Sequence, residues 1–321
     1  IPLETDQTLQ PLDPILRQIL FNRQIETREA AVGYLNALPP PGCRPENMLG
    51  IPEAVDRIWY ALEKGEQIAV YGDYDADGVS ATALLTDVLS RLNANVQGYI
   101  PNRFEDGYGL NNEALNLLAD QNVRLVITVD CGVRSLAEVE HASSLGIDTI
   151  VTDHHQPGPQ LPAAVAVVDP KIPGDTYPDR NLAGVGLAYK LASALLEKAG
   201  FQPPDDSYPS PAIDYLDLVA LGSVADQVPL LNENRSLVRT GLDYLRRPHR
   251  QGVLSLIGAA QISPETITAD SIGFGLAPRL NAAGRLESAL TALNLLLSRD
   301  VGEAARLAQY LDVQNRERQE I

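Results

Sequence analysis

The sequence predicts an α/β fold, with an open, mostly parallel five-stranded sheet flanked by helices and followed by a helical region. Short apolar runs alternate with helical segments between residues 67 and 199. These runs lack the alternation of polar and apolar residues typical of a sheet with one face in water, so we expect helices on both faces. Beyond a Pro- and Asp-rich loop at 201–211, the chain turns helical and stays so.

The expected elements follow in order. An amphipathic helix at 12–36 precedes a Pro-rich break and a helix at 52–64. The strands are expected at 67–71, 96–100, 125–129, 149–152 and 165–168. The helices that accompany the strands are expected at 79–92, 112–120, 135–145 and 184–199. Later helices are expected at 213–225, 236–245, 252–257, 290–297 and 303–321.

This order predicts four regions. They are an N-terminal helical extension at 1–50, an α/β domain at 51–205, a helical region completing the same lobe at 206–300, and the start of a long connecting helix at 301–321. The last run ends on NRERQEI without the Gly or Pro that usually stops a helix, so we expect a truncated helix and a longer natural chain.

Composition limits the classes of protein. The 321 residues are 45% hydrophobic, which suits a buried sheet, and no apolar run approaches the roughly 18 residues of a membrane span. No secretory signal is visible at the N-terminus, and the two cysteines, Cys43 and Cys131, cannot form a disulfide framework. A cytoplasmic protein that does not bind membranes is the expectation.

The formal net charge is −17, whereas proteins that grip nucleic acid usually present a basic surface. Acidic residues that bind metal would account for part of this charge. A site that holds one strand end needs only a local basic groove.

Acidic residues follow three of the predicted strands directly. Asp73, Asp75 and Asp77 follow the first, Asp130 the third, and Asp153 with His154 and His155 the fourth. In an open parallel sheet the carboxyl ends of the strands share one edge, so these side chains should converge. Carboxylates gathered there repel one another unless cations neutralise them.

The residue types predict which cation binds. Oxygen ligands with one or two imidazoles and no thiolate pair suit two Mg²⁺ or Mn²⁺ ions, which can activate water and hold a phosphate. Asp75 and Asp77 can serve neighbouring ions, while Gly78 permits a tight turn before the next helix. A single Asp at a strand end is as often a turn former or helix cap. For Asp169 the turn interpretation is preferred, and Asp73 is either a turn residue or a partner of a ligand.

Four segments in chain order resemble the motifs of the DHH superfamily of phosphoesterases: DYDADG at 73–78, VDCG at 129–132, VTDHH at 151–155 and ALGSVAD at 220–226. Segments at 99–111, 181–192 and 272–286 resemble the branch that degrades single-stranded DNA from its 5′ end. The resemblance runs from about residue 12 to the last residues. It implies a metal-dependent 5′-to-3′ exonuclease of DNA repair and recombination, with a single-stranded-DNA-binding protein among its partners. It also implies further substrate-binding domains beyond the final helix.

The resemblance also implies roles. The metal ligands would be Asp75, Asp77, Asp130, His154 and Asp226, with Asp130 bridging both ions. His155 would contact the scissile phosphate or its leaving oxygen, and Asp153 and Asp73 would support the site. Some relatives place a His four residues before the position of Asp75, where this chain has Tyr71, so its first metal site should be richer in oxygen.

Basic and polar residues in two segments are candidates for DNA binding. Arg279, Asn281 and Arg285, in APRLNAAGR, suggest a loop that grips phosphate, or an arginine-capped helix junction. Arg103 and Tyr108, in PNRFEDGYG, suit a phosphate contact and a stacked base. Alternatively, Tyr108 anchors a loop and Arg103 pairs with a neighbouring acid.

Two other functions are compatible with these motifs. The chain could be a phosphodiesterase of short oligonucleotides or small nucleotides, although the long helical region argues against that compact class. It could also be a non-catalytic scaffold of the replication machinery, although acids at every motif position argue against a site that has lost its metals. Activity with Mn²⁺ and its loss in EDTA would separate an enzyme from a scaffold.

Overall fold

The structure, a computed structural model, describes residues 1–101, 109–203, 210–286 and 289–320, of which 283–286 are described in their backbone only. Its centre is one parallel sheet in the order β2-β1-β3-β4-β5. The strands are β1 (Gln67–Gly72), β2 (Asn95–Tyr99), β3 (Val123–Val129), β4 (Asp148–Thr152) and β5 (Ala166–Val168). All five lie within two residues of their predicted bounds, and the predicted fold class is confirmed.

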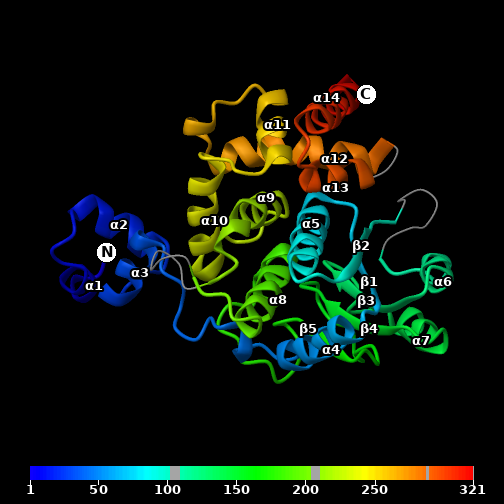
Figure 1. The fold of residues 1–321 in the computed structure, drawn as a ribbon. Helices are drawn as coiled ribbons and strands as arrows, with labels where there is room; N and C mark the ends of the chain where they lie inside the picture. Colours follow the sequence, from blue (N-terminus) through cyan, green and yellow to red (C-terminus); the bar gives the residue numbers. More distant parts are fainter. Residues whose placement is uncertain (102–108, 204–209, 287–288, 321) are drawn as a thin grey trace.

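Helices cover both faces of the sheet (Figure 1). One face contacts α4 (Ile51–Lys64), α5 (Ala76–Arg91) and α8 (Gly184–Lys198). The other contacts α6 (Asn112–Asp120) and α7 (Leu136–Ser144). Alternate residues of β1 explain the two layers, because Ile68 and Val70 join the core beneath α5 while Ala69 and Tyr71 join the core beneath α6.

The strand order places a topological switch between β1 and β3. From β1 the chain runs through α5 to the edge strand β2, and it returns through α6 to β3 on the other side of β1. Successive crossovers therefore leave β1 and β3 in opposite directions, which opens a crevice at their carboxyl ends.

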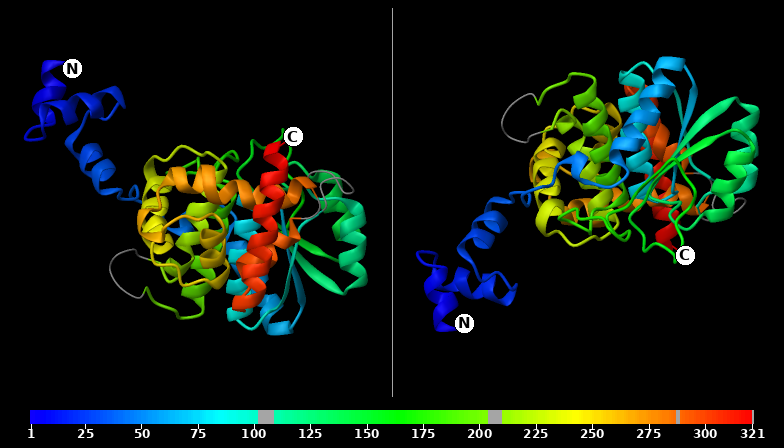
Figure 2. Two further views of the ribbon diagram at one scale, coloured as in Figure 1. Left: turned by 90° about the horizontal axis from the view of Figure 1, so that it is seen from above. Right: turned by 90° about the horizontal axis from the view of Figure 1, so that it is seen from below.

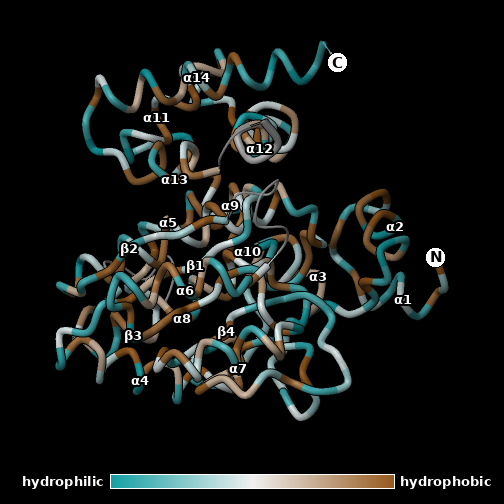
Figure 3. The backbone as a smooth tube through the Cα atoms, turned by 90° about the vertical axis from the view of Figure 1, so that its right-hand side faces the viewer, coloured by the Kyte–Doolittle hydropathy of each residue, from teal (hydrophilic) through white to brown (hydrophobic). Residues whose placement is uncertain are grey.

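The helical region forms a second tier. Its α-helices are α9 (Leu216–Ala225), α10 (Asn232–Leu245), α11 (Gln251–Ala259), α12 (Ala277–Leu286), α13 (Leu290–Leu297) and α14 (Val301–Glu320). Helix α9 packs on α5 and α8, and α11 to α14 lie beyond it (Figure 3). The 3-10 helices are η1 (Pro45–Asn47), which precedes α4, and η2 (Ile213–Tyr215) and η3 (Pro264–Thr266) in the helical region. The segment η4 (Ser271–Leu276) is a π-helix.

Two predictions about local structure were wrong. Residues 12–36 form two helices, α2 (Pro14–Asn22) and α3 (Arg28–Asn36), because Gln24 takes a left-handed conformation and Thr27 caps the start of α3. The APRLNAAGR segment is not a loop, since η4 runs directly into α12.

A further helix, α1 (Leu3–Thr8), was not predicted. Helices α1 to α3 stand apart from the sheet in both views of Figure 2. Arg235 of α10 connects them to the helical region through a hydrogen bond from Nε to the carbonyl oxygen of Tyr34 (2.8 Å). Among the helices of the described residues, none combines the length and apolar character of a membrane span.

Candidate metal centre

The carboxyl ends of three neighbouring strands carry the predicted site, and backbone hydrogen bonds hold them in line. Asp73 donates its backbone N–H to Val129 (3.4 Å), Asp130 to Thr152 (3.0 Å) and Asp153 to Val168 (3.0 Å). The ladder of the sheet therefore continues for one residue past each strand. The acids predicted to converge do lie at one edge, over the switch between β1 and β3.

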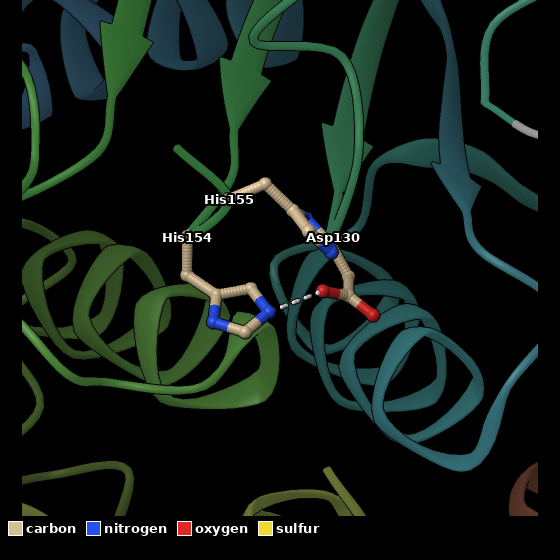
Figure 4. Close-up of side chains that lie close together, drawn as sticks. All are labelled: Asp130, His154 and His155. Atoms are coloured by element: carbon tan, nitrogen blue, oxygen red, sulfur yellow. Dashed lines mark ion pairs between the residues drawn. The ribbon is translucent and has the colours of Figure 1, made fainter. Parts of the chain in front are cut away.

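Asp130 and His154 face each other at the centre of this edge (Figure 4). His154 Nε2 lies 3.0 Å from Asp130 Oδ1 and 3.6 Å from Asp226 Oδ2. Within the described part of the chain, neither His154 Nε2 nor Asp130 Oδ1 forms a hydrogen bond, although both atoms are buried. Asp73 Oδ1 is likewise buried without a hydrogen bond to the described residues. Buried polar atoms without partners are costly, so their convergence fits a bound cation.

Three overlapping groups in the described residues could each hold an ion, because their ligand atoms lie within 4.8 Å of one another. The groups are Asp73 with Asp75 and Asp130, Asp77 with His154 and Asp226, and Asp130 with His154 and His155. Asp130 and His154 each belong to two of the groups. The five residues predicted as ligands all fall within these three groups, and the bridging role of Asp130 stays a prediction.

Electrostatics favour the same conclusion. Burial and the neighbouring Asp75 raise the pKa of Asp73 to about 7 and that of Asp226 to about 6. The pKa values of Asp77 and Asp130 also rise well above their usual range, from burial first and then from adjacent carboxylates. Without a cation the cluster holds protons, and a divalent ion would replace them.

Asp153 organises the two histidines that follow it. Its Oδ1 accepts hydrogen bonds from the backbone N–H of His154 (2.7 Å) and of His155 (3.1 Å), and its Oδ2 accepts one from Val133 (2.9 Å). The Nδ1 of His155 also lies 2.7 Å from Asp153 Oδ1. Asp153 belongs to none of the three groups, but its carboxylate contacts both histidines that do and orients the His155 ring.

The pKa values of the two imidazoles shift in opposite directions. Burial and the neighbouring His155 lower the pKa of His154 to about 4, so its ring is neutral and able to bind a metal. The hydrogen bond to Asp153 raises the pKa of His155, which is half-exposed. Burial would raise the pKa of Asp153, but its contacts with His155 outweigh burial and hold the pKa below its usual range.

Asp75 and Asp77 begin α5 and serve as helix caps as well as candidate ligands. Asp75 is the N-cap, and its Oδ1 accepts from the N–H groups of Asp77 (2.8 Å) and Gly78 (3.0 Å). Asp77 is fully buried and accepts from the N–H groups of Gly184 (2.7 Å) and Val185 (3.0 Å), at the start of α8. The turn at Gly78 needs glycine for space, because a Cβ there would lie 2.5 Å from the carbonyl oxygen of Asp73.

Two glycines that sequence reasoning missed let helices approach the acids. A Cβ on Gly184 would lie 2.5 Å from the Cβ of Asp130, and one on Gly222 would lie 2.5 Å from Asp77 Oδ1. Gly222 lies in α9, whose C-cap is Asp226. Asp226, which looked from the residues alone like a surface acid at a helix end, is thereby brought to His154.

Other predicted residues lie elsewhere. Tyr71 points to the opposite face of the sheet, where its hydroxyl donates to the carbonyl oxygen of Gly109 (3.0 Å). Asp169 is buried at a turn, with Oδ1 accepting from Lys171 N–H (2.8 Å), and belongs to none of the three groups.

The candidate DNA-binding residues are resolved in part. Arg279 pairs with Asp312 of α14 (2.7 Å) and donates to the carbonyl oxygen of Gly275, an arrangement that matches the helix-junction alternative. Asn281 Oδ1 accepts from the backbone N–H of Ala76 (2.7 Å). Arg103, Tyr108 and the side chain of Arg285 lie outside the described residues.

Comparison with known proteins places this geometry in a family. Residues 67–223 match the model described as DHH family, N-terminal domain. A crystal structure of the exonuclease RecJ bound to manganese is 38% identical, with a TM-score of 0.77 over 85% of this chain and 67% of that one. This chain belongs to the RecJ branch of the DHH family.

Other members of the RecJ branch agree. The single-stranded-DNA-specific exonuclease RecJ of Bacillus subtilis is 44% identical over 97% of this chain and 38% of its own length. The corresponding protein of Escherichia coli is 39% identical over 99% of this chain and 56% of its own length. RecJ of Thermus thermophilus in complex with Mn²⁺ is 34% identical with a TM-score of 0.83, and this chain covers 45% of it. The chain thus spans about half, or less, of the length of these relatives.

Proposed function

We propose that this chain is the catalytic part of a metal-dependent exonuclease that removes nucleotides from the 5′ end of single-stranded DNA, in repair and recombination. The observation that carries the proposal is the pair of buried atoms Asp130 Oδ1 and His154 Nε2, which lie 3.0 Å apart without hydrogen bonds in the described structure, where three groups of possible metal ligands overlap. Membership of the RecJ branch supports the substrate, because its curated relatives are named single-stranded-DNA-specific exonucleases.

Two divalent ions, Mn²⁺ or Mg²⁺, fit the donor set, which is carboxylate-rich with neutral imidazole. Asp75, Asp77, Asp130, His154 and Asp226 would hold them. When bound, such ions supply positive charge to the phosphate and lower the pKa of the attacking water.

The chain's own residues would orient the substrate and donate a hydrogen bond to the phosphate. Asp153 orients the half-exposed ring of His155 through Nδ1 (2.7 Å), and this ring would contact the scissile phosphate or its leaving oxygen. The raised pKa of His155 favours a protonated ring, which can donate to a phosphate oxygen. Asp73 would support the ligands Asp75 and Asp130, with which it forms one group.

Strand binding is assigned to Asn281 and Arg285 on α12 and to Arg103 and Tyr108. Asn281 stands beside the first turn of α5, which brings α12 to the metal centre. With a net charge of −17, only local cations draw DNA to this site, so we expect a high KM and strong salt sensitivity.

We propose a cytoplasmic location, consistent with the absence of a disulfide between Cys43 and Cys131. A single-stranded-DNA-binding protein is the partner we propose, because both proteins would occupy the same strand.

The test is a time course on long single strands labelled at one end. We expect release from the 5′ label in Mn²⁺, none in EDTA, and slow cleavage of dinucleotides. Turnover that persists in EDTA would exclude the metal mechanism. Release from the 3′ label first would show that the polarity is wrong.

A further inference from the structure

Lys171 lies in the turn after β5, contacts the backbone of His154, and has no role in the function proposed above. Val168 of β5 pairs with Thr152 of β4, so the turn after β5 lies beside the Asp153–His155 turn. From this turn Lys171 extends its Nζ to the carbonyl oxygen of His154 and donates a hydrogen bond to it.

The base of the Lys171 side chain is fixed. Its backbone N–H donates to Oδ1 of the buried Asp169 (2.8 Å), and Ile172 N–H closes the turn on the carbonyl oxygen of Asp169 (3.1 Å). Arg180 Nε donates a hydrogen bond to the carbonyl oxygen of Pro170 (2.9 Å). A side chain that begins in so constrained a turn can place its ammonium group reproducibly.

The accepting carbonyl belongs to the peptide that joins His154 to His155. A peptide unit is planar, so holding its oxygen fixes the direction in which both residues leave it. The two rings are otherwise held by different partners, the His154 ring by the backbone of Leu182 and the His155 ring by Asp153. Their centroids lie 4.6 Å apart at an interplanar angle of 59°.

We propose that Lys171 is a positioning residue that holds the His154–His155 peptide and thereby aims both imidazoles at the metal and the phosphate. The inference rests on the proposed function, because it concerns the same site. The charge of Lys171 also acts on His154 and on Asp226, the C-cap of α9. Partners of this kind commonly change metal affinity or activity by about 10–100-fold when removed.

The test compares Lys171→Met, which removes the donor and the charge, with Lys171→Arg, which keeps both. Lys64→Met, at the exposed end of α4, is the matched control. Mn²⁺ affinity is measured by calorimetry. We expect Lys171→Met to weaken binding about tenfold, Lys171→Arg to recover most of it, and Lys64→Met to leave it unchanged. If Lys171 were only a nearby cation, Lys171→Met would instead tighten Mn²⁺ binding, because the repulsion between the ammonium group and the ion would be removed.

A second measurement does not depend on metal or turnover. The chain has four histidines, so ¹⁵N-histidine spectra of the metal-free protein are simple. In Lys171→Met the ring signals of His154 and His155 should move, while those of His141 and His249 should stay and report an intact fold. On DNA, kcat should fall with KM unchanged.

The possible failures are distinguishable. If the unaltered chain neither binds Mn²⁺ nor cuts DNA, the proposed function is wrong. If it does both, and Lys171→Met leaves Mn²⁺ affinity and the His154 and His155 signals unchanged, only the positioning role is overturned. A raised KM with unchanged kcat would also overturn it, since Lys171 would then bind the strand.

Discussion

Asn281 of α12 accepts a hydrogen bond from the backbone N–H of Ala76 (2.7 Å), between the two acids that begin α5. The helical tier therefore completes the N-terminus of a helix in the α/β domain, 205 residues away in sequence. Part of the metal centre's framework thus comes from outside the segment that matches the DHH family model.

Replacing Asn281 by Ala should destabilise the chain by about 1 kcal/mol, because the Ala76 N–H loses its acceptor at a helix start. Denaturant unfolding measures this cost, and Asn36→Ala, at the exposed end of α3, is the control. Unchanged stability of Asn281→Ala would show that this hydrogen bond does not hold the start of α5, whatever the effect on DNA binding.

Asp130→Ala should abolish hydrolysis and leave the fold intact. The metal-free variant should be at least as stable as the unaltered chain, because one buried carboxylate is relieved of its neighbours' repulsion. The decisive measurement is the melting temperature with and without Mn²⁺, since the variant should lose the rise that the ion produces. Near-normal turnover of Asp130→Ala would contradict its bridging role.

The metal-free chain should lose stability as pH rises from about 4 to about 7. Asp73, with its pKa raised from 3.8 to about 7, keeps its proton in the folded state after the unfolded state has released it. Asp226 acts in the same direction up to about 6. His154, with its pKa lowered from 6.5 to about 4, opposes them, but the raised carboxyls outnumber it.

The same groups predict that Mn²⁺ stabilises the chain more at higher pH, because the ion binds the ionised carboxylates. Thermal unfolding at about pH 5 and about pH 7, with and without Mn²⁺, checks both statements. An ion-induced shift that shrinks between these pH values would contradict the carboxylate cluster as the binding site.

Arg279→Ala should cost about 1.5–3 kcal/mol of stability, because a charged hydrogen-bonded pair between α12 and α14 is lost. In a double-mutant cycle with Asp312→Ala, the two changes should be strongly non-additive. If the single variant keeps its stability and loses DNA affinity, Arg279 grips phosphate, as the other interpretation of its sequence holds.

Gly184→Ala should disrupt Mn²⁺ binding and destabilise the chain by about 1–3 kcal/mol, because the new Cβ overlaps Asp130. Gly186→Ala, two residues on in the same helix, meets Leu182 at 3.4 Å and should be neutral or slightly stabilising. Calorimetry with Mn²⁺ compares the two variants. Equal affinities would mean that α8 yields without disturbing the acid.

The strands and α5 were predictable, because a buried parallel sheet requires unbroken apolar runs and because acids at strand ends must share an edge. Asp226 was not predictable from its surroundings, since its role depends on where α9 packs, and only the family resemblance indicated it. The close approaches at Gly184 and Gly222 are likewise tertiary, and helical glycines carry no distinct sequence signal. The missed break near Gln24 reflects how weakly a single left-handed residue is marked in an amphipathic pattern.

The backbone bonds that extend the sheet past Asp73, Asp130 and Asp153 have a consequence for affinity. Acids on a mobile loop would have to be ordered before an ion could bind, and the loss of conformational entropy would weaken binding. Here the carboxylates are attached to the hydrogen-bonded core itself, so the cage is preorganised and little ordering remains to be done.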